Sequence, residues 1–190
     1  MKPSHSMSKV YLLVICLLAA SFTGCLDRLS GEDDDNSQIN FQPETRVELK
    51  TAVDEWIEDS DSASSTYGDI SDWDVSNVTN MDTMFNSAES FNGDILDWNV
   101  SSVTSMYSMF YQASSFNQDI SDWDVSNVRD MGGIFSGATS FNQDISGWDV
   151  SSVTNMYGMF RSAQSFNQDI SEWDVSSVTD MTDMFDYADL

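Results

Sequence analysis

The chain has 190 residues, a length typical of a single domain. Its 32 Asp and Glu residues outnumber its 7 Lys and Arg residues, so the formal net charge is −25. A charge of this sign repels phosphate backbones and excludes nucleic acid as a partner. It favours cations and cationic partners, although an acidic surface is equally typical of a protein that is simply soluble.

Residues 1–24 have the features of a lipoprotein signal peptide. A basic start is followed by an apolar run over residues 10–22, which is too short to span a bilayer comfortably. The run leads into the sequence FTGC, which resembles a bacterial lipobox and implies cleavage before Cys25 and lipidation of its sulfur. An ordinary secretory signal with an unrelated cysteine is the alternative. We expect a lipid anchor at Cys25, in the outer membrane if the cell has two membranes, because Leu26 stands where lipoproteins of an inner membrane often carry Asp.

Cleavage there would remove the groups that most catalytic sites need. His5 and Cys16 lie in the leader and Cys25 would be acylated, so the mature chain would have no imidazole, no free thiol and no internal disulfide. Loss of Lys2 and Lys9 would lower the formal net charge from −25 to −27. Triad catalysis and zinc sites with His or Cys ligands are therefore excluded, which leaves carboxylate-based chemistry as the one enzymatic option. We expect a protein that is not an enzyme.

The segment before the repeats divides into a tether and a cap. Residues 25–43 are acidic and poor in apolar residues, which predicts a flexible tether. After Pro43, apolar residues recur at helical spacing: Val47, Leu49, Val53, Trp56 and Ile57. We predict that residues 44–68 form an N-terminal capping helix, a degenerate repeat that closes the core.

Residues 69–190 contain five copies of one 25-residue sequence. The first copy reads DISDWDVSNVTNMDTMFNSAESFNG, and every copy keeps its tryptophan and its central phenylalanine in register. We call the copies repeats 1 to 5; they cover residues 69–93, 94–118, 119–143, 144–168 and 169–190. A fixed period of this length marks an array of stacked units that bury their apolar faces against one another.

Apolar spacing within a repeat predicts a short strand followed by a short helix. Trp73 and Val75 are two residues apart, as on one face of a strand, and the residues from Val78 to Ala88 follow helical spacing. Stacked repeats would place their strands in a parallel sheet, roughly 4.8 Å apart. The predicted fold class is α/β: a solenoid of short parallel strands and short helices, with five repeats and a capping helix.

The shared pattern DISxWDVSxVTxMxxMFxxAxxFNQ resembles the repeat of the BspA-like leucine-rich-repeat surface proteins, the mycoplasma-type lipoprotein repeat family of unknown function. The segment TRVELKTAVDEWIED resembles the helix that precedes such arrays, so the likeness covers residues 44–190. The resemblance implies a leucine-rich-repeat-like solenoid, a cell-surface location and a role in adhesion. It implies no catalytic residues.

Several residue types form columns through the stacked repeats. The methionine and phenylalanine columns have core spacing, although a redox or metal column is the alternative. The tryptophan column is either core or a platform for sugar rings.

Two aspartate columns flank the predicted strand. Their members are Asp69, Asp94, Asp119, Asp144 and Asp169 in one column, and Asp74, Asp124, Asp149 and Asp174, interrupted by Asn99, in the other. Each Asp is expected to accept backbone N–H bonds in an Asx-turn. The competing hypothesis is calcium shared between successive turns, since calcium prefers oxygen ligands.

Positions that differ between repeats are free of the shared core, and they are either ordinary solvated variation or candidates for partner binding. Tyr107, Tyr111, Tyr157 and Arg161 are residue types enriched in interfaces and are predicted to lie on an exposed helix face. Gly132 and Gly133 interrupt the helical pattern, which predicts a soft spot in repeat 3.

These observations predict a lipid-anchored bacterial cell-surface protein, non-enzymatic, whose repeat array binds an extracellular protein or a glycan. The alternative is a calcium-stabilised structural protein of the cell envelope without a dedicated ligand. At the far end, the sequence leaves three readings open: Leu190 closes the core, the end is exposed and associates, or the chain is truncated.

Overall fold

A computed structural model describes residues 39–188. The predicted signal peptide, the lipidation site at Cys25 and most of the predicted tether lie outside the described residues. Within 39–188, no helix combines the length and the apolar character needed to cross a membrane.

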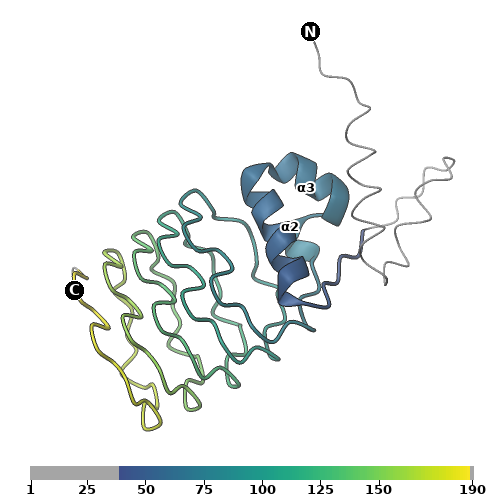
Figure 1. Cartoon of the computed structure of the whole chain (residues 1–190). Coiled ribbons are helices and arrows are strands. Elements are labelled where there is room, and N and C mark those ends of the chain that lie inside the picture. Colours follow the sequence, from purple (N-terminus) through teal and green to yellow (C-terminus); the bar gives the residue numbers. More distant parts are fainter. Residues whose placement is uncertain (1–38, 189–190) are drawn as a thin grey trace, which may run out of the picture. The chain divides into compact units, whose positions relative to one another are not determined.

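Two helices form one end of the described structure (Figure 1). Helix α2 covers Arg46–Glu58 and begins with a capping box, in which Thr45 and Glu48 each accept a backbone N–H from the other residue. Helix α3 covers Ser60–Tyr67. Asp59 separates the two helices and caps the start of α3 by accepting the N–H of Ser62. A short 3-10 helix, η2, follows at Ile70–Asp72.

The helices occupy the segment in which a single capping helix was predicted. Leu49 and Val53 of α2 are fully buried, and Trp56 and Ile57 pack partly against the core. Val47 is 70% exposed, so the prediction that it belongs to the apolar stripe is wrong. The separate helix α3 was not predicted.

The predicted alternation of strands and helices in the repeats is wrong. In the described part of the repeats, residues 69–188, there is no strand, and η2 is the only helical element. Each repeat is instead a succession of turns, and the repeats follow one another in a stack (Figure 1). Neighbouring repeats share one isolated parallel bridge each: Asn80 with Ser105, Ser105 with Asp130, Asp130 with Asn155, and Asn155 with Asp180. The fold is therefore not an α/β leucine-rich-repeat solenoid.

Local hydrogen bonds explain why no strand forms between Ile70 and Val75. Asp69 accepts the N–H of Ser71 at 3.0 Å, and Asp74 accepts the N–H of Ser76 at 3.1 Å. The N–H of Trp73 donates to the carbonyl of Ile70. These turns use backbone groups that a sheet would need, a competition that Asp and Ser side chains promote.

Left-handed residues explain why no helix forms between Val78 and Ala88. Thr83 has φ 57° and Ser87 has φ 59°, and both are the third residue of a turn closed by an N–H to C=O bond. A positive φ at that position is a feature of type II turns and is incompatible with a right-handed helix. The apolar residues of this segment therefore lie on two consecutive turns, at residues 81–84 and 85–88, and not on one face of a helix.

A polarised ladder of backbone bonds joins the repeats. In repeat 1, the N–H groups of alternate residues donate to repeat 2 at 2.7–2.9 Å: Met81 to Ser105, Thr83 to Tyr107, Phe85 to Met109, and Ser87 to Tyr111. The same four bonds recur between each later pair of neighbouring repeats. In this segment, N–H groups point toward the following repeat and carbonyl groups point toward the preceding one.

In repeats 1 to 4, burial confirms the core interpretation of the methionine, phenylalanine and tryptophan columns. The central phenylalanines of repeats 1 to 4 are fully buried, and Phe85 stacks on Phe110 with ring centroids 5.3 Å apart. Trp98 is 2% exposed, and its indole N–H donates to the carbonyl of Ile70 in the repeat before it. The tryptophans therefore present no open platform for sugar rings.

An asparagine ladder adds a second link between repeats. The backbone N–H of Asn117 donates to the side-chain oxygen of Asn92 at 2.8 Å, and Asn142 and Asn167 continue the series. The side chain of Gln118 also donates to the carbonyl of Asn92. The asparagine column therefore bonds from one repeat to the next.

Candidate binding groove

The predicted partner-binding residues line one surface groove with a volume of about 520 Å³, which we call the tyrosine groove. Repeat 2 contributes Tyr107, Ser108, Tyr111 and Gln112; repeat 3 contributes Gly133, Ser136 and Gly137; repeat 4 contributes Tyr157, Gly158, Arg161 and Ser162. The tyrosines come from repeats 2 and 4, while repeat 3 contributes only small residues. The groove therefore has aromatic sides and a floor of glycine and serine.

The small residues of repeat 3 make the groove possible. Gly133 and Ser136 are buried, whereas Tyr107 is 44% exposed and Tyr157 is 39% exposed. A Cβ atom on Gly132 would lie 3.2 Å from Cδ2 of Tyr107, so the Tyr107 ring lies close against the third repeat because position 132 has no side chain. Gly132, which was predicted to belong to a soft spot, thus leaves the space that the Tyr107 ring occupies.

The backbone of the floor also suits glycine. Gly133 has φ 63° and Gly137 has φ 74°, at the two positions where repeat 1 has the left-handed Thr83 and Ser87. Glycine adopts this region without steric cost, whereas other residues do not. Because repeat 3 forms no helix, the argument that Gly132 and Gly133 weaken a helix does not apply.

Arg161 differs from the tyrosines because its charge is already engaged. Its guanidinium lies 3.4 Å from the carboxylate of Asp186 and 3.9 Å from that of Asp183. It also lies over the Tyr187 ring, 5.6 Å from the centroid. Arg161 therefore links repeat 4 to repeat 5, and only part of its surface faces the groove.

The aspartate columns form the predicted Asx-turns. In every repeat, the residue of the first column accepts the backbone N–H two positions later at 3.0–3.1 Å. The second column makes the same contact at 3.0–3.2 Å, with Asn99 taking the place of Asp in repeat 2. An amide oxygen can replace the carboxylate, which indicates that the acceptor atom matters more than the charge.

The turn contacts stabilise the charged form of these carboxylates. Hydrogen bonds from the backbone and side chain of Ser121 hold the pKa of Asp119 below its ordinary value of 3.8. The side chain and backbone of Ser146 lower the pKa of Asp144 in the same way. Repulsion from the next aspartate in the column acts in the opposite direction but is the weaker effect.

The structure brings no metal-binding set of these residues together. Among residues 39–188, no group of three or more His, Cys, Asp or Glu side chains is arranged so as to hold a metal ion. The predicted calcium ligands are thus distributed singly along the stack, each with its own serine or leucine N–H.

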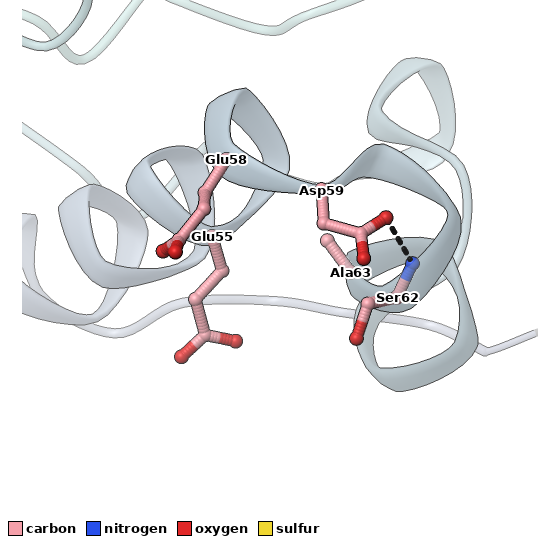
Figure 2. A pocket seen from close by; sticks show the side chains of 5 residues that line it. All are labelled: Glu55, Glu58, Asp59, Ser62 and Ala63. Carbon is pink, nitrogen blue, oxygen red and sulfur yellow. Dashed lines mark hydrogen bonds between the residues drawn. The ribbon is translucent and has the colours of Figure 1, made fainter. Parts of the chain in front are cut away.

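A second hollow lies on the two-helix end and was not predicted. It is lined by Glu55, Glu58, Asp59, Ser62 and Ala63 (Figure 2). Asp59 is occupied there as the cap of α3, as the dashed line in Figure 2 shows. Nearby, burial and the charge of Glu55 raise the pKa of Tyr67 to about 12. The hollow is acidic and contains no aromatic side, so it offers fewer contacts for a ligand than the tyrosine groove.

Sequence reasoning identified the sides of the groove but not its floor. Tyr107 and Tyr157 stood out because they vary between repeats, whereas Gly133, Ser136 and Gly137 were not recognised as lining residues. The signal was available in the repeat alignment, where repeat 3 has a small residue at every position that faces the groove.

The comparisons with known proteins identify the family but no activity. The family described as "Mycoplasma protein of unknown function, DUF285" matches residues 54–146 and 118–190. The comparisons with curated proteins and with solved structures find no match. The two matched segments overlap and together cover residues 54–190, which hold the end of α2, helix α3 and all five repeats, so the chain belongs to the family of mycoplasma proteins of unknown function known as DUF285.

Proposed function

We propose that the chain is a non-enzymatic surface protein of the BspA-like kind, anchored through lipid at Cys25, that binds an extracellular protein or a glycan in the tyrosine groove. The observation that carries this proposal is the placement of Tyr107, Tyr111 and Tyr157 around a floor of small residues. Tyrosine supplies a large apolar face and a hydroxyl group with few rotatable bonds, which suits it to binding surfaces.

The chemistry of the groove supports a neutral ligand. The two exposed tyrosines are two repeats apart, which corresponds to about 10 Å at the usual spacing of stacked chains. The hydroxyl groups of Ser108, Ser136 and Ser162 and the amide of Gln112 also line the groove. A sugar ring or a flat side chain could contact an aromatic face and hydrogen bond to these groups at the same time.

The sequence offers little support for catalysis. His5, Cys16 and Cys25 are the only His and Cys residues, and all precede the family match. The carboxylates of the two aspartate columns are engaged as turn acceptors. A binding role therefore fits the available side chains better than a hydrolytic one.

The proposal is tested by screening the full chain against an array of glycans and a panel of immobilised extracellular proteins. The variant Tyr107→Ser, Tyr111→Ser, Tyr157→Ser should lose binding and keep its melting temperature within a few degrees, because none of the three side chains is fully buried. Arg161 is left unchanged because it supports repeat 5.

A matched control replaces exposed apolar residues outside the groove: Val47→Ser and Leu96→Ser. This control should bind as the unchanged protein does. Retention of binding by the tyrosine variant, or loss of binding by the control, would contradict the proposed role of the groove.

A further inference from the structure

Two serines that line the tyrosine groove have hydroxyl groups without a partner in the chain. Ser108 is 7% exposed and Ser136 is 8% exposed, and they are the only buried polar residues within residues 39–188. Neither hydroxyl group forms a hydrogen bond with another residue of that part of the chain. A buried hydroxyl group left unpaired is unfavourable, so water or a ligand is expected to pair with it.

Both hydroxyl groups open onto the groove. The two serines are among its lining residues. Across the described residues, Arg46 Nε is the only enclosed side-chain nitrogen or oxygen atom without a hydrogen-bond partner, so the oxygen atoms of the two serines are not sealed inside the protein. A Cβ atom on Gly133 would lie 3.1 Å from Ser108 Oγ. The missing side chain at Gly133 therefore keeps the Ser108 hydroxyl group accessible.

Polar side chains at the equivalent positions of other repeats have partners within the chain. Thr83 is equivalent to the first serine, and its hydroxyl oxygen accepts a hydrogen bond from Arg46 at 2.9 Å. Asp186 is equivalent to the second serine, and its carboxylate lies 3.4 Å from the guanidinium of Arg161. The unpaired hydroxyl groups are thus a feature of the repeats that form the groove and not of the repeat in general.

The backbone of the groove floor is already paired, which disfavours a peptide strand as the ligand. The N–H of Gly133 donates to the carbonyl of Tyr157, and the N–H of Gly137 donates to the carbonyl of Arg161, each at 2.7 Å. A peptide that adds to an exposed edge obtains its affinity from free main-chain groups. Hydrogen bonds to a ligand in this groove must therefore come mainly from side chains.

The groove carries no free charge. The chain has 32 Asp and Glu residues, yet none of them lines the groove. Arg161 is the only charged lining residue, and Asp186 already faces its guanidinium. An acidic ligand would find no unpaired cation there and would be repelled by the net charge of −25, while a basic ligand would find no carboxylate. The groove therefore suits an uncharged ligand.

We propose that the ligand of the tyrosine groove is a neutral glycan, whose hydroxyl groups pair with those of Ser108 and Ser136 and whose ring faces contact Tyr107 and Tyr157. This inference rests on the proposed function and assigns the ligand class of the same site. A serine hydroxyl group both donates and accepts, as a sugar hydroxyl group does, so the two can pair in either direction. The groove volume of about 520 Å³ lies within the range of roughly 300–1,000 Å³ that is typical of small-molecule sites, which suits a few sugar units.

The first experiment determines the ligand class with the full chain. It compares an array of neutral, sialylated and sulfated oligosaccharides with a panel of extracellular proteins from which the glycans have been removed enzymatically. Binding to neutral oligosaccharides is expected. Their affinity, measured by titration calorimetry, should change by less than about twofold when the salt concentration is raised from about 0.05 M to about 0.5 M, because salt screens only charged groups.

A pair of double variants tests the serine hydroxyl groups. Ser108→Ala with Ser136→Ala should weaken binding of the neutral oligosaccharide by about tenfold or more, because two hydrogen bonds to the ligand are lost. The melting temperature should stay within a few degrees, since neither hydroxyl group has a partner within residues 39–188. The control, Ser102→Ala with Ser152→Ala, removes two exposed hydroxyl groups that do not line the groove. It should leave binding within about twofold.

The outcomes separate this inference from the proposed function. If no neutral oligosaccharide binds, or if only charged ones do, the ligand class is wrong. Binding of a deglycosylated protein that the tyrosine variant abolishes would then leave the proposed function in place. Equal affinities of the two serine variants for the neutral oligosaccharide would also overturn the inference. Neutral-glycan binding that survives the tyrosine variant would overturn both, because the glycan would then bind outside the groove.

Discussion

The two ends of the described stack differ in how their backbone groups and apolar side chains are covered. In residues 81–87 and the equivalent segments, N–H groups donate to the following repeat and carbonyl groups accept from the preceding one, so within the described stack this segment leaves carbonyls of repeat 1 and N–H groups of repeat 5 without a neighbouring repeat. At the start, helix α2 covers the acceptor side, and Arg46 donates to the carbonyl of Asp82 and to Thr83 Oγ1. At repeat 5, the described residues supply no equivalent cover, and Met181 and Val175 are exposed. The comparison indicates that a repeat of this family depends on its neighbours for its core.

The largest loss of stability is expected from truncating a methionine in the interior of the stack, compared with the equivalent methionine in repeat 5. Met106→Ala should lower the free energy of unfolding by about 2–5 kcal/mol because it opens a cavity in a closed core. Met181→Ala should cost less than about 1 kcal/mol, since Met181 is 40% exposed whereas Met106 is fully buried. Urea unfolding followed by tryptophan fluorescence measures both. Similar losses would show that repeat 5 is as well covered as repeat 2.

Arg46→Ala tests the capped end. The loss of its guanidinium leaves the carbonyl of Asp82 without this donor, which should cost about 1–3 kcal/mol. Arg129→Ala is the matched control, because Arg129 is exposed and its side chain forms no ion pair or hydrogen bond within residues 39–188. The same unfolding experiment compares the two variants. An equal loss of stability in the two variants would show that the hydrogen bonds of Arg46 do not stabilise this end of the stack.

Glycine at a left-handed position should matter more than glycine elsewhere in the same repeat. Gly158 has φ 57°, and a Cβ atom there would meet only Arg161 Cβ at 3.8 Å, so the expected cost of Gly158→Ala is backbone strain of about 1 kcal/mol. Gly147→Ala should be close to neutral, because a Cβ atom at Gly147 has no neighbour within 4 Å and φ lies outside the left-handed region. Melting temperatures measured by circular dichroism distinguish these cases. A neutral Gly158→Ala would argue against left-handed turns as the reason that no helix forms.

The acidic turns should make stability depend on pH in one direction. The pKa values of Asp119, Asp144 and Asp169 are lowered in the folded chain by hydrogen bonds from the serines two residues later. Their contribution to stability is therefore complete above the ordinary value of 3.8 and is lost as the pH falls through the lowered values. Melting temperature measured from pH 5 down to pH 2 should fall.

Substitution of these three residues by Asn should reduce that fall, because the amide oxygen still accepts the N–H bond, as Asn99 does. Changing Asp97, Asp122 and Glu172 to amides removes the same formal charge from a neighbouring exposed column and serves as the control. A pH profile that is flattened equally by both triple variants would assign the effect to net charge instead of the turns.

Calcium should have the smallest effect. If the aspartate columns act only as turn acceptors, millimolar calcium and magnesium at equal ionic strength should raise the melting temperature of the full chain by the same amount, through screening of its negative charge. A rise of many degrees that is specific to calcium would support the alternative in which the stack is a calcium-stabilised envelope element.

The repeat period and the buried columns could be predicted from the sequence, but the backbone conformation within a repeat could not. The period, the buried columns and the Asx-turns follow from residues that recur every 25 positions. The predicted helix failed because the spacing of Val78, Met81, Met84 and Phe85 also suits consecutive turns. Thr83 and Ser87 are not residue types that indicate a positive φ. The indication lies at the equivalent positions of other repeats, which are occupied by Gly133, Gly137 and Gly158.

The candidate site was predictable to the same extent. Variation between repeats singled out the tyrosines, which do line one groove, although their role in binding stays a prediction. The pairing of Arg161 with Asp183 and Asp186 could not be foreseen, because it depends on how closely repeats 4 and 5 approach. The direction of the backbone ladder between repeats could not be predicted either, since it depends on backbone conformation and not on side-chain type.

Hydrogen exchange of individual amides in the full chain, measured by NMR without any partner, tests the contrast between interior and end most directly. Slow exchange is expected for the amides of Met106, Ser108, Phe110 and Gln112, whose N–H groups donate to repeat 3. Exchange at least about a hundredfold faster is expected for the amides of Met181, Asp183, Phe185 and Tyr187, because exposed groups open at almost no free-energy cost. Equal protection of the two sets would contradict this contrast, since the N–H groups of repeat 5 would then be covered within the chain.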